Sequence, residues 1–318
     1  MLRSLRRFAA IARTPVLPES AALHARNWAR VPGEMRTPHQ MLGRQGNGCG
    51  ATIGAMPRCD FACRGCYLGE GANRIPAEPV EAIKAQMRQL RPSLGASGNL
   101  QLTDGEITLR PDDEVIELIR YARELELIPM LMTHGDSFRR RPGLLERYMT
   151  EGGLSEVSIH VDTTQRGRTG AAYKRAESED ALNPLRDEFA RMIRHARRDT
   201  GLPLRAATTV TVTRDNLAGI PDVTRWVARN SDAFRMISFQ PVAQVGRTEE
   251  RLGAITVDEL WAHIAEALYG SAAAVARLER GAKWLGHPAC NRIVHGVIVR
   301  HGGDEPAFHP IRETGDAT

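Results

Sequence analysis

Strand-like runs and amphipathic helical patterns alternate along most of this chain, and this alternation restricts its fold more than any other feature. Each run rich in β-branched and apolar residues is followed by a segment with apolar residues at helical spacing. The strand-like segments are 49–56, 99–106, 128–135, 156–162, 204–213 and 234–242. The helical segments are 77–92, 111–125, 141–153, 180–201, 220–230 and 256–270.

This order of segments predicts a parallel sheet. Strands separated by helices are joined by right-handed crossovers, so neighbouring strands run the same way and helices cover the sheet. Six such units are too few to close an eight-stranded barrel. The chain is therefore expected to be an α/β protein, either an open partial barrel or a doubly wound sheet.

The composition excludes several other classes of protein. Of the 318 residues, 42 % are hydrophobic and 25 % are charged. No apolar run approaches the roughly 18 residues needed to cross a bilayer. The 43 Lys and Arg residues alternate with 38 Asp and Glu residues, giving a net charge of +5 without a basic block. We expect a cytoplasmic globular protein that does not bind nucleic acid.

The N-terminus is an exception to this even distribution of charge. Residues 1–20 carry Arg3, Arg6, Arg7 and Arg13 before the first acid, and small or apolar residues recur there at helical spacing. The arginines interrupt any apolar core of a signal peptide. Two interpretations remain open: a frayed or locally packed helix, and an amphipathic helix in peripheral contact with an anionic membrane.

The cysteines decide between the two sheet architectures. Cys59, Cys63 and Cys66 follow the first predicted strand with C-x3-C-x2-C spacing, whereas Cys49 and Cys290 are isolated. An odd number of cysteines without a signal peptide gives no reason to expect disulfides, so clustered thiols indicate a metal. Structural zinc sites use four ligands, and Cys49 is expected at the far end of the strand. Three thiolates with one open position are typical of a reactive metal centre.

This cysteine cluster, placed after the first strand, resembles that of the radical SAM superfamily, over roughly residues 48–245. The resemblance implies a partial (β/α)6 TIM-like barrel in which Cys59, Cys63 and Cys66 hold a [4Fe-4S] cluster. It also implies that S-adenosyl-L-methionine chelates the fourth iron and is cleaved to a 5'-deoxyadenosyl radical, which takes hydrogen from an organic substrate. An electron donor such as flavodoxin or ferredoxin is then expected. The expected regions are an N-terminal extension (1–45), the barrel (46–245) and a C-terminal helix and tail (246–318).

The same resemblance assigns residues near the second strand and the cysteines to S-adenosylmethionine. The segment "TDGE" is similar to the family's GGE motif, which binds the methionyl amino group. It contributes Asp104, Gly105 and Glu106, with Asp104 in place of the first glycine. The family's aromatic residue before the third cysteine is Gly65 here, and Tyr67 is the candidate substitute.

Polar residues on three later strands are further candidates for contact with the cofactor. Ser158, His160 and Asp162 alternate with apolar residues on the fourth strand, so they should face the barrel lumen while the apolar set packs under helices. By the resemblance, Ser158, His160, Thr209 and Gln240 are candidate contacts of S-adenosylmethionine. Packing within the lumen is the alternative explanation for these residues.

The reaction subtype does not follow from the residues. Only Cys290 comes after the cluster, which argues against auxiliary clusters. The tract 236–247 and "HPAC" at 287–290 are loosely similar to molybdenum-cofactor cyclases and tetraether-lipid synthases. This similarity and the basic N-terminus favour an apolar or lipid-like substrate within the wider expectation of a small-molecule or lipid substrate. The alternative to an enzyme is a non-catalytic zinc- or iron-binding module, in which the three cysteines form a zinc knuckle with a histidine.

Overall fold

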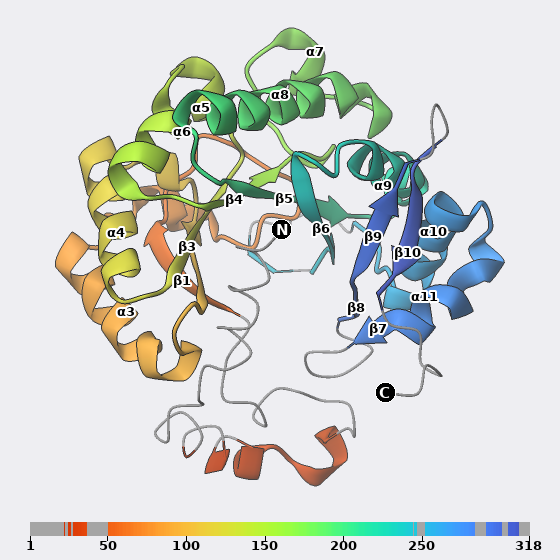
Figure 1. The fold of residues 1–318 in the computed structure, drawn as a ribbon, viewed down its shortest axis with the longest axis horizontal. Helices are drawn as coiled ribbons and strands as arrows, with labels where there is room; N and C mark the ends of the chain where they lie inside the picture. The colour runs from red at the N-terminus through yellow and green to blue at the C-terminus, as the bar shows by residue number, and fades with distance from the viewer. Residues whose placement is uncertain are drawn as a thin grey trace.

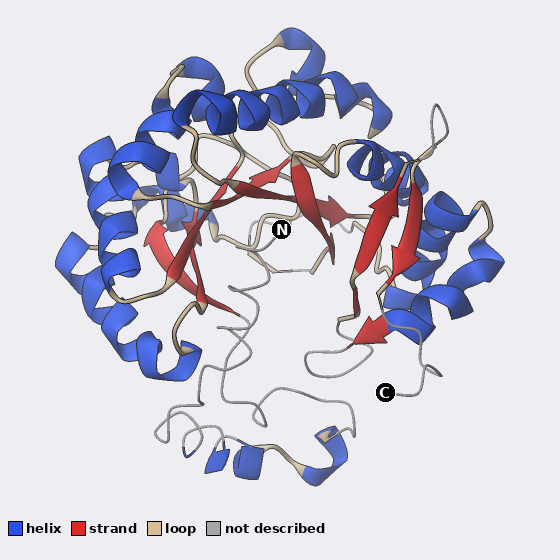
Figure 2. Cartoon of the chain, viewed as in Figure 1, coloured by secondary structure: helices blue, strands red, loops and turns tan. Residues whose placement is uncertain are grey.

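The computed structural model of the chain describes residues 22, 25–26, 28–36, 50–243, 245–246, 252–283, 291–300 and 305–311. Helices surround a curved sheet in this structure (Figure 1, Figure 2). Six parallel strands form the sheet in the order β1-β2-β3-β4-β5-β6. Their bounds are Gly50–Met56 (β1), Asn99–Asp104 (β2), Ile128–Thr133 (β3), Glu156–His160 (β4), Arg205–Val212 (β5) and Phe234–Pro241 (β6).

The strand order decides between the two predicted architectures. A doubly wound sheet reverses its strand order at a switch point. Here each strand pairs with its neighbours in sequence, and β1 and β6 form the two edges. Such a sheet winds in one direction and curves into part of a barrel with the helices outside. The expected partial (β/α)6 barrel is confirmed.

The crossover helices lie on the outer face of the sheet and cover the apolar side of its strands (Figure 1). Their bounds are Val80–Leu94 (α3), Asp112–Glu124 (α4), Asp136–Arg140 (α5), Leu144–Arg147 (α6), Asn183–Thr200 (α8) and Ile220–Arg229 (α9). In α8, Leu185, Phe189, Ile193 and Ala196 recur at helical spacing and are fully buried in the core. Burial of this face, at about 25 cal/mol per Å² of apolar area, holds the helix in place.

One predicted helix begins later than expected and changes its hydrogen-bonding pattern. The pattern over 141–153 predicts a helix from residue 141, whereas α6 begins at Leu144 and continues into a π-helical turn over Tyr148–Gly152; the separate short helix α5 ends before it, at Arg140. Gly143 has a φ of +86°, a left-handed conformation that glycine adopts without a steric penalty and that a continuous right-handed helix does not contain. A new helix therefore begins after it.

The described part of the C-terminal region contains more than the expected helix. That helix is α10 (Val257–Tyr269), which begins with a capping box formed by Thr256 and Glu259. It packs with α9 in a second apolar cluster beside β5 and β6. The further elements are α11 (Val275–Gly281) and the antiparallel pairs β7 (Ala282–Lys283) with β8 (Ile293–Val294) and β9 (Gly296–Val299) with β10 (Ala307–Pro310).

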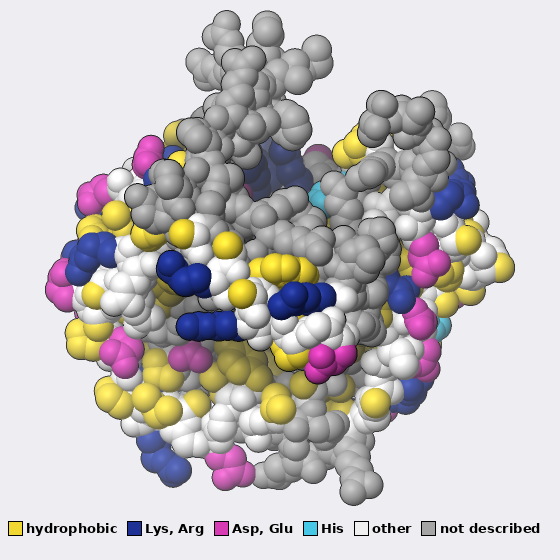
Figure 3. Space-filling model, turned by 90° about the horizontal axis from the view of Figure 1, so that it is seen from below, with side chains coloured by type: hydrophobic (Ala, Val, Ile, Leu, Met, Phe, Trp, Pro, Cys, Tyr) yellow, Lys and Arg dark blue, Asp and Glu magenta, His cyan; other side chains and the backbone are white. Residues whose placement is uncertain are grey.

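Several expectations fall on parts of the chain that are not described. The basic residues of the N-terminus, Cys49 and Cys290 lie outside the described residues, so their roles stay predictions. Among the described helices, none has the length and apolar character needed to span a membrane. On the face drawn in Figure 3, acidic and basic side chains are interspersed among hydrophobic ones.

Candidate active site

A pocket lies at the carboxyl ends of the strands, where parallel α/β proteins bind their ligands. The cavity has a volume of about 140 Å³ and is lined by the loop after β1 and by residues at the ends of β2 to β6. The predicted site residues that line it are Cys59, Cys63, Cys66, Tyr67, Asp104, Gly105, Glu106, His160 and Gln240. The fold therefore brings together most of the residues that the sequence singled out.

The three cysteines of the loop share this pocket, and none forms a disulfide. Burial raises the pKa of Cys59 and of Cys63 to about 12. Both side chains are therefore neutral thiols at neutral pH unless a metal binds and stabilises the thiolate. An iron–sulfur cluster supplies that positive charge, so these donors fit such a group.

A single metal ion bound by all three thiols fits less well. Two thiolates on one tetrahedral zinc ion lie about 3.8 Å apart, because each Zn–S bond is about 2.3 Å long. Among the described residues, the one group of three potential ligands within 4.8 Å of one another is Cys59, Asp60 and His134, which contains one thiol. In that group Nδ1 of His134 accepts a hydrogen bond from the Asp136 N–H, and Nε2 bonds to Asp60. The imidazole has no free nitrogen for a metal.

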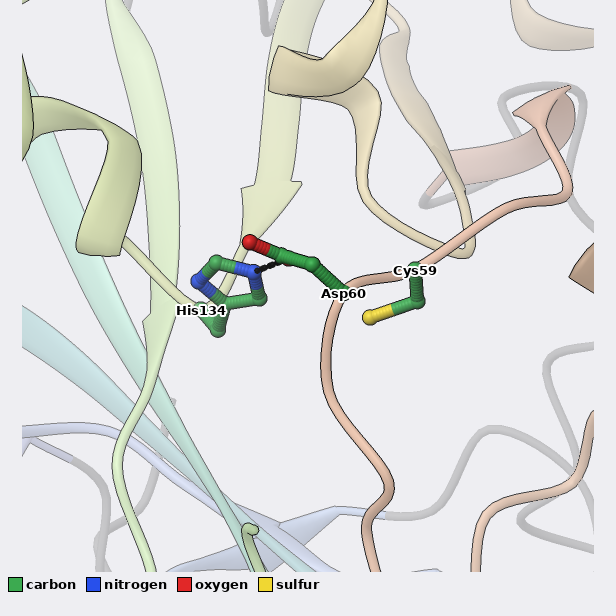
Figure 4. Close-up of side chains that lie close together, drawn as sticks. All are labelled: Cys59, Asp60 and His134. Atoms are coloured by element: carbon green, nitrogen blue, oxygen red, sulfur yellow. Dashed lines mark hydrogen bonds and ion pairs between the residues drawn. The ribbon is translucent and has the colours of Figure 1, made fainter. Parts of the chain in front are cut away.

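His134 connects the cysteine loop to the end of β3 (Figure 4). Its Nε2 is 2.8 Å from Oδ1 of Asp60, and its ring stacks on Phe61 with the ring centroids 3.7 Å apart. Asp60 also accepts a hydrogen bond of 2.9 Å from Arg140. The hydrogen bond from His134 and the charge of Arg140 hold the pKa of Asp60 well below its usual range. Asp60 is therefore an anion that fixes the loop beside the first cysteine.

The loop after β4 holds the cysteine loop through backbone pairing. The N–H groups of Ala62 and Arg64 donate to the C=O groups of Arg166 and Thr164, each at 2.9 Å. Backbone hydrogen bonds of this kind set the position of main-chain atoms and not of side chains alone. The direction of the cysteines therefore depends on a segment distant in sequence.

The turn after β2 is built against the start of the cysteine loop. The N–H of Gly105 donates to the C=O of Met56 at 2.7 Å, and that of Glu106 donates to the C=O of Arg58 at 2.8 Å. A Cβ atom on Gly105 would lie 2.2 Å from the Arg58 carbonyl oxygen. Only glycine lets the two backbones approach this closely.

Glu106 lines the pocket, but its carboxylate is used by the protein. Oε1 accepts from the Thr108 N–H and from the hydroxyls of Thr108 and Thr133, and Oε2 accepts from the His134 N–H, all between 2.6 and 3.1 Å. These four donors match the roughly four acceptor sites of a carboxylate. Glu106 therefore uses its carboxylate to fix the end of β3.

Gly65 and Tyr67 occupy the region where the family pattern has an aromatic residue. Gly65 has a φ of +72°, and a Cβ there would lie 2.7 Å from Cγ2 of Val242, so the packing of this loop excludes a larger side chain. Tyr67 follows Cys66 and is 58 % exposed. Its hydroxyl donates to the C=O of Asp104 at 2.8 Å, which ties the cysteine loop to the turn after β2.

The predicted lumen residues divide into two groups. His160 and Gln240 line the pocket. Ser158 and Thr209 are buried away from the pocket lining, and their hydroxyl oxygens are 3.2 Å apart. Since the carboxyl ends of the strands form the mouth, Ser158 and Thr209 lie deeper in the barrel.

His160 presents a buried ring nitrogen that lacks a hydrogen-bond partner in the described structure. Nε2 is buried and makes no hydrogen bond with the part of the chain that the structure describes. Burial lowers the pKa of His160 to about 4, so the ring is neutral at neutral pH. A buried polar atom without a partner is unfavourable. In the wall of a pocket, such an atom is available to a bound ligand.

Sequence reasoning missed several pocket residues. One of them had a signal, because His134 directly follows an apolar strand. Asp162 is different: the alternation on its strand predicts that it faces the lumen with His160, but the family resemblance does not name it as a cofactor contact. The other polar lining residues that were not predicted are Arg64, Thr103, Thr133, Thr164, Gln165 and Thr211. These belong to loops and strand ends that no local pattern distinguishes from ordinary surface.

The family model described as "Radical SAM superfamily" matches residues 53–217, just over half of the 318-residue chain. The chain belongs to the radical SAM superfamily. Enzymes of this family use a [4Fe-4S] cluster and S-adenosylmethionine. The pocket described above lies within the matched residues except for its contribution from β6.

The curated relatives of this radical SAM protein are considerably longer than the matched region. A 7,8-dihydro-6-hydroxymethylpterin dimethyltransferase of Methanocaldococcus jannaschii is 28 % identical over 214 residues, which are 66 % of this chain and 40 % of the relative. A GTP 3',8-cyclase of Mycobacterium marinum is 28 % identical over 137 residues, 42 % of this chain and 36 % of the relative. The match thus spans less than half the length of either relative.

A solved structure shares the fold. The crystal structure of Streptococcus suis SuiB bound to precursor peptide SuiA matches 70 % of this chain and 47 % of that chain, with a TM-score of 0.51 and 12 % sequence identity. At this identity the likeness supports the fold alone.

Proposed function

We propose that this protein is a radical SAM enzyme in which Cys59, Cys63 and Cys66 hold the [4Fe-4S] cluster in the pocket at the barrel mouth. When bound, the cluster supplies the electron that cleaves S-adenosylmethionine to a 5'-deoxyadenosyl radical, and this radical abstracts hydrogen from an organic substrate. One observation carries the proposal: three thiols and the ends of five strands line one cavity.

The chain's own groups would bind and orient S-adenosylmethionine. The backbone of the turn over 104–106 offers polar groups beside the cysteines, and Tyr67 fixes that turn through its hydroxyl. His160 offers a neutral nitrogen that no group in the described ranges of the chain bonds, and Gln240 offers an amide. Ser158 and Thr209 would support the lumen wall beneath them.

We propose a polar small molecule as the substrate. The names of the two curated relatives refer to a pterin and to GTP, and both of these heterocycles carry N–H donors. The pocket offers matching acceptors on Asp104 and Gln240. A lipid-like substrate, the other proposal from the sequence, needs an apolar channel connected to this pocket.

We also propose that the electron donor docks beside Cys59, which borders a second, shallow hollow of about 370 Å³. The residues lining this hollow are Arg58, Cys59, Asp60, Asn73 and Leu109. Asp60 is already paired with Arg140 and His134, whereas Arg58 is exposed and has no ion pair among the described residues. The positive charge of Arg58 is complementary to an acidic electron carrier of the flavodoxin or ferredoxin type.

Anaerobic reconstitution tests the enzyme proposal. We expect about four irons per chain, matching sulfide and release of 5'-deoxyadenosine from S-adenosylmethionine under dithionite. Cys59→Ala, Cys63→Ala and Cys66→Ala should each lose iron, while the matched controls Cys49→Ala and Cys290→Ala should retain it. A colourless protein with one zinc ion and no cleavage would establish the metal-binding module instead.

The docking proposal has its own test. Arg58→Glu should slow cleavage driven by a reduced acidic flavodoxin and leave cleavage driven by dithionite unchanged. Equal slowing with both reductants would place the effect of Arg58 on the cofactor site and contradict docking.

A further inference from the structure

Three carboxylates line the pocket, and one of them has no hydrogen-bond or ion-pair partner among the described residues. Glu106 accepts four hydrogen bonds, as described above. Asp162 accepts from the N–H and the hydroxyl of Thr164 through Oδ1, and from the Thr211 N–H through Oδ2. The carboxylate of Asp104 makes no hydrogen bond or ion pair with any described residue. Of the three, Asp104 is the one available to a bound molecule.

The backbone at Asp104 adopts a conformation that favours glycine. Its φ is +110°, beyond the left-handed helical region near +57° that aspartate can tolerate. Glycine reaches such angles without a steric penalty. A side chain is therefore present at a position where glycine would fit the backbone better.

Strand β1 leaves room for this carboxylate. The neighbouring residue on β1 is Gly54, which has no side chain. A Cβ atom added to Gly54 would lie 3.0 Å from Oδ2 of Asp104. Ile53 is buried in the core under the helices, so Gly54, the next residue on the strand, faces the lumen. The carboxylate thus extends from the turn after β2 over the lumen side of β1.

We propose that the Asp104 carboxylate recognises an N–H donor on the substrate bound in the lumen. A carboxylate accepts two parallel hydrogen bonds from an amidine-like edge, and it also attracts an ammonium group. This inference rests on the proposed function, which supplies an amino-substituted heterocyclic substrate. The methionyl ammonium of S-adenosylmethionine, which the family resemblance assigns to this turn, is the alternative ligand that the test must exclude. The position of the carboxylate over the lumen side of β1 favours the substrate.

Matched ligands test this role in the reconstituted protein. GTP and ITP differ by the 2-amino group, which supplies one of the two parallel donors. Asp104→Asn keeps the shape of the side chain and removes its charge. It should weaken GTP binding about tenfold to a hundredfold and change ITP binding much less. In the second arm, S-adenosylmethionine is compared with 5'-methylthioadenosine, which lacks the ammonium. A loss confined to S-adenosylmethionine would assign the carboxylate to the cofactor and overturn this inference.

The unfolding midpoint provides a readout that needs no activity. Asp104→Gly should raise the unfolding midpoint of the ligand-free protein. It should also lower the affinity for the same ligand whose binding Asp104→Asn weakens. Ser97→Gly is the matched control, because Ser97 also has a positive φ, +63°, but lies before the other end of β2. It should leave every ligand affinity unchanged.

Two results separate the possible failures. In the first, the wild-type protein takes up iron, and the Asp104 variants bind all four ligands as tightly as the wild type does. That result would overturn this inference and leave the proposed function standing. The role of Asp104 is equally contradicted if GTP does not bind and the affinity for S-adenosylmethionine is unchanged. Wild-type protein that takes up no iron would overturn the proposed function itself.

Discussion

Asp60 accepts a hydrogen bond of 2.8 Å from Nε2 of His134, and this contact joins the cysteine loop to the end of β3. The Asp136 N–H donates to Nδ1 of the same imidazole, so Nε2 is the nitrogen that carries the proton in the neutral ring. The placement of Cys59 therefore depends on a pair of side chains that need not touch the cofactor.

Replacing Asp60 should loosen this loop. Asp60→Asn keeps an acceptor for His134 but removes the charge that attracts Arg140. We expect the free energy of unfolding to fall by about 1–3 kcal/mol and iron to be lost faster to a chelator. Urea unfolding and the rate of iron release measure the two effects. Asp222→Asn, which removes an exposed ion pair on α9, is the control and should change neither. Equal iron release from both variants would show that Asp60 does not anchor the loop.

The turn after β2 should not tolerate a side chain on its glycine. In Gly105→Ala, the new methyl group would lie 2.2 Å from the Arg58 carbonyl oxygen and 2.6 Å from that of Pro57. The turn must therefore shift, which should lower the free energy of unfolding by about 1–3 kcal/mol. The affinity for S-adenosylmethionine should fall as well, because the turn lines the pocket. Calorimetric unfolding and ligand titration measure both. Gly69→Ala serves as the control because no atom lies within 4 Å of its added Cβ. Unchanged stability of Gly105→Ala would mean that the turn is more adaptable than its contacts indicate.

The strands and their inward faces were predictable because they follow from local periodicity. The two-residue alternation correctly predicted that His160 faces the lumen. Such alternation predicts which side of the sheet a residue faces, but it does not predict how deep in the barrel the residue lies. Ser158 lies two residues earlier, about 6.6 Å deeper. Thr209 pairs with His160 in register, yet Thr211 lines the pocket. Barrel strands tilt relative to the axis, so residues in register do not lie at equal height.

The contacts that hold the cysteine loop were not predictable from local patterns. His134 and Arg168 bind partners from distant segments, and only the folded chain brings these together. Arg168 lies in a polar stretch typical of solvent-exposed loops, yet its side chain is 1 % exposed. It donates to the C=O of His134 at 2.8 Å and to Oδ1 of Asp136 at 3.1 Å.

Arg168 should therefore be essential for stability. Arg168→Met removes the donor and leaves Asp136 buried with less compensation, so we expect a loss of about 3–5 kcal/mol. The exposed Arg191 on α8 is the matched control, and Arg191→Met should change stability by less than about 0.5 kcal/mol. Adding Asp136→Asn to Arg168→Met should cost less than the sum of the two single changes, which urea unfolding can measure. Additive losses would show that the two side chains do not interact.

His160 should make the stability of the metal-free chain depend on pH. Burial lowers its pKa in the folded protein to about 4 from a usual value of 6.5. Between these values the unfolded chain binds a proton that the folded chain does not, so stability falls as pH falls, by up to about 3 kcal/mol. Above pH 6.5 this contribution is absent.

His160→Leu removes both the titration and the unpaired nitrogen. The variant should be at least as stable as the wild type at pH 7.5 and should gain on it as the pH falls to 5, because only the wild type must keep a buried imidazole neutral. Urea unfolding at pH 7.5, 6 and 5 measures the difference. The exposed His309 supplies the control, since His309→Leu should follow the wild-type curve over this range. The reconstituted His160→Leu protein should bind S-adenosylmethionine or its substrate more weakly, so that stability and ligand affinity change in opposite directions. Parallel pH curves for wild type and His160→Leu would show that the imidazole is hydrated in the folded protein and not held as a neutral donor for a ligand.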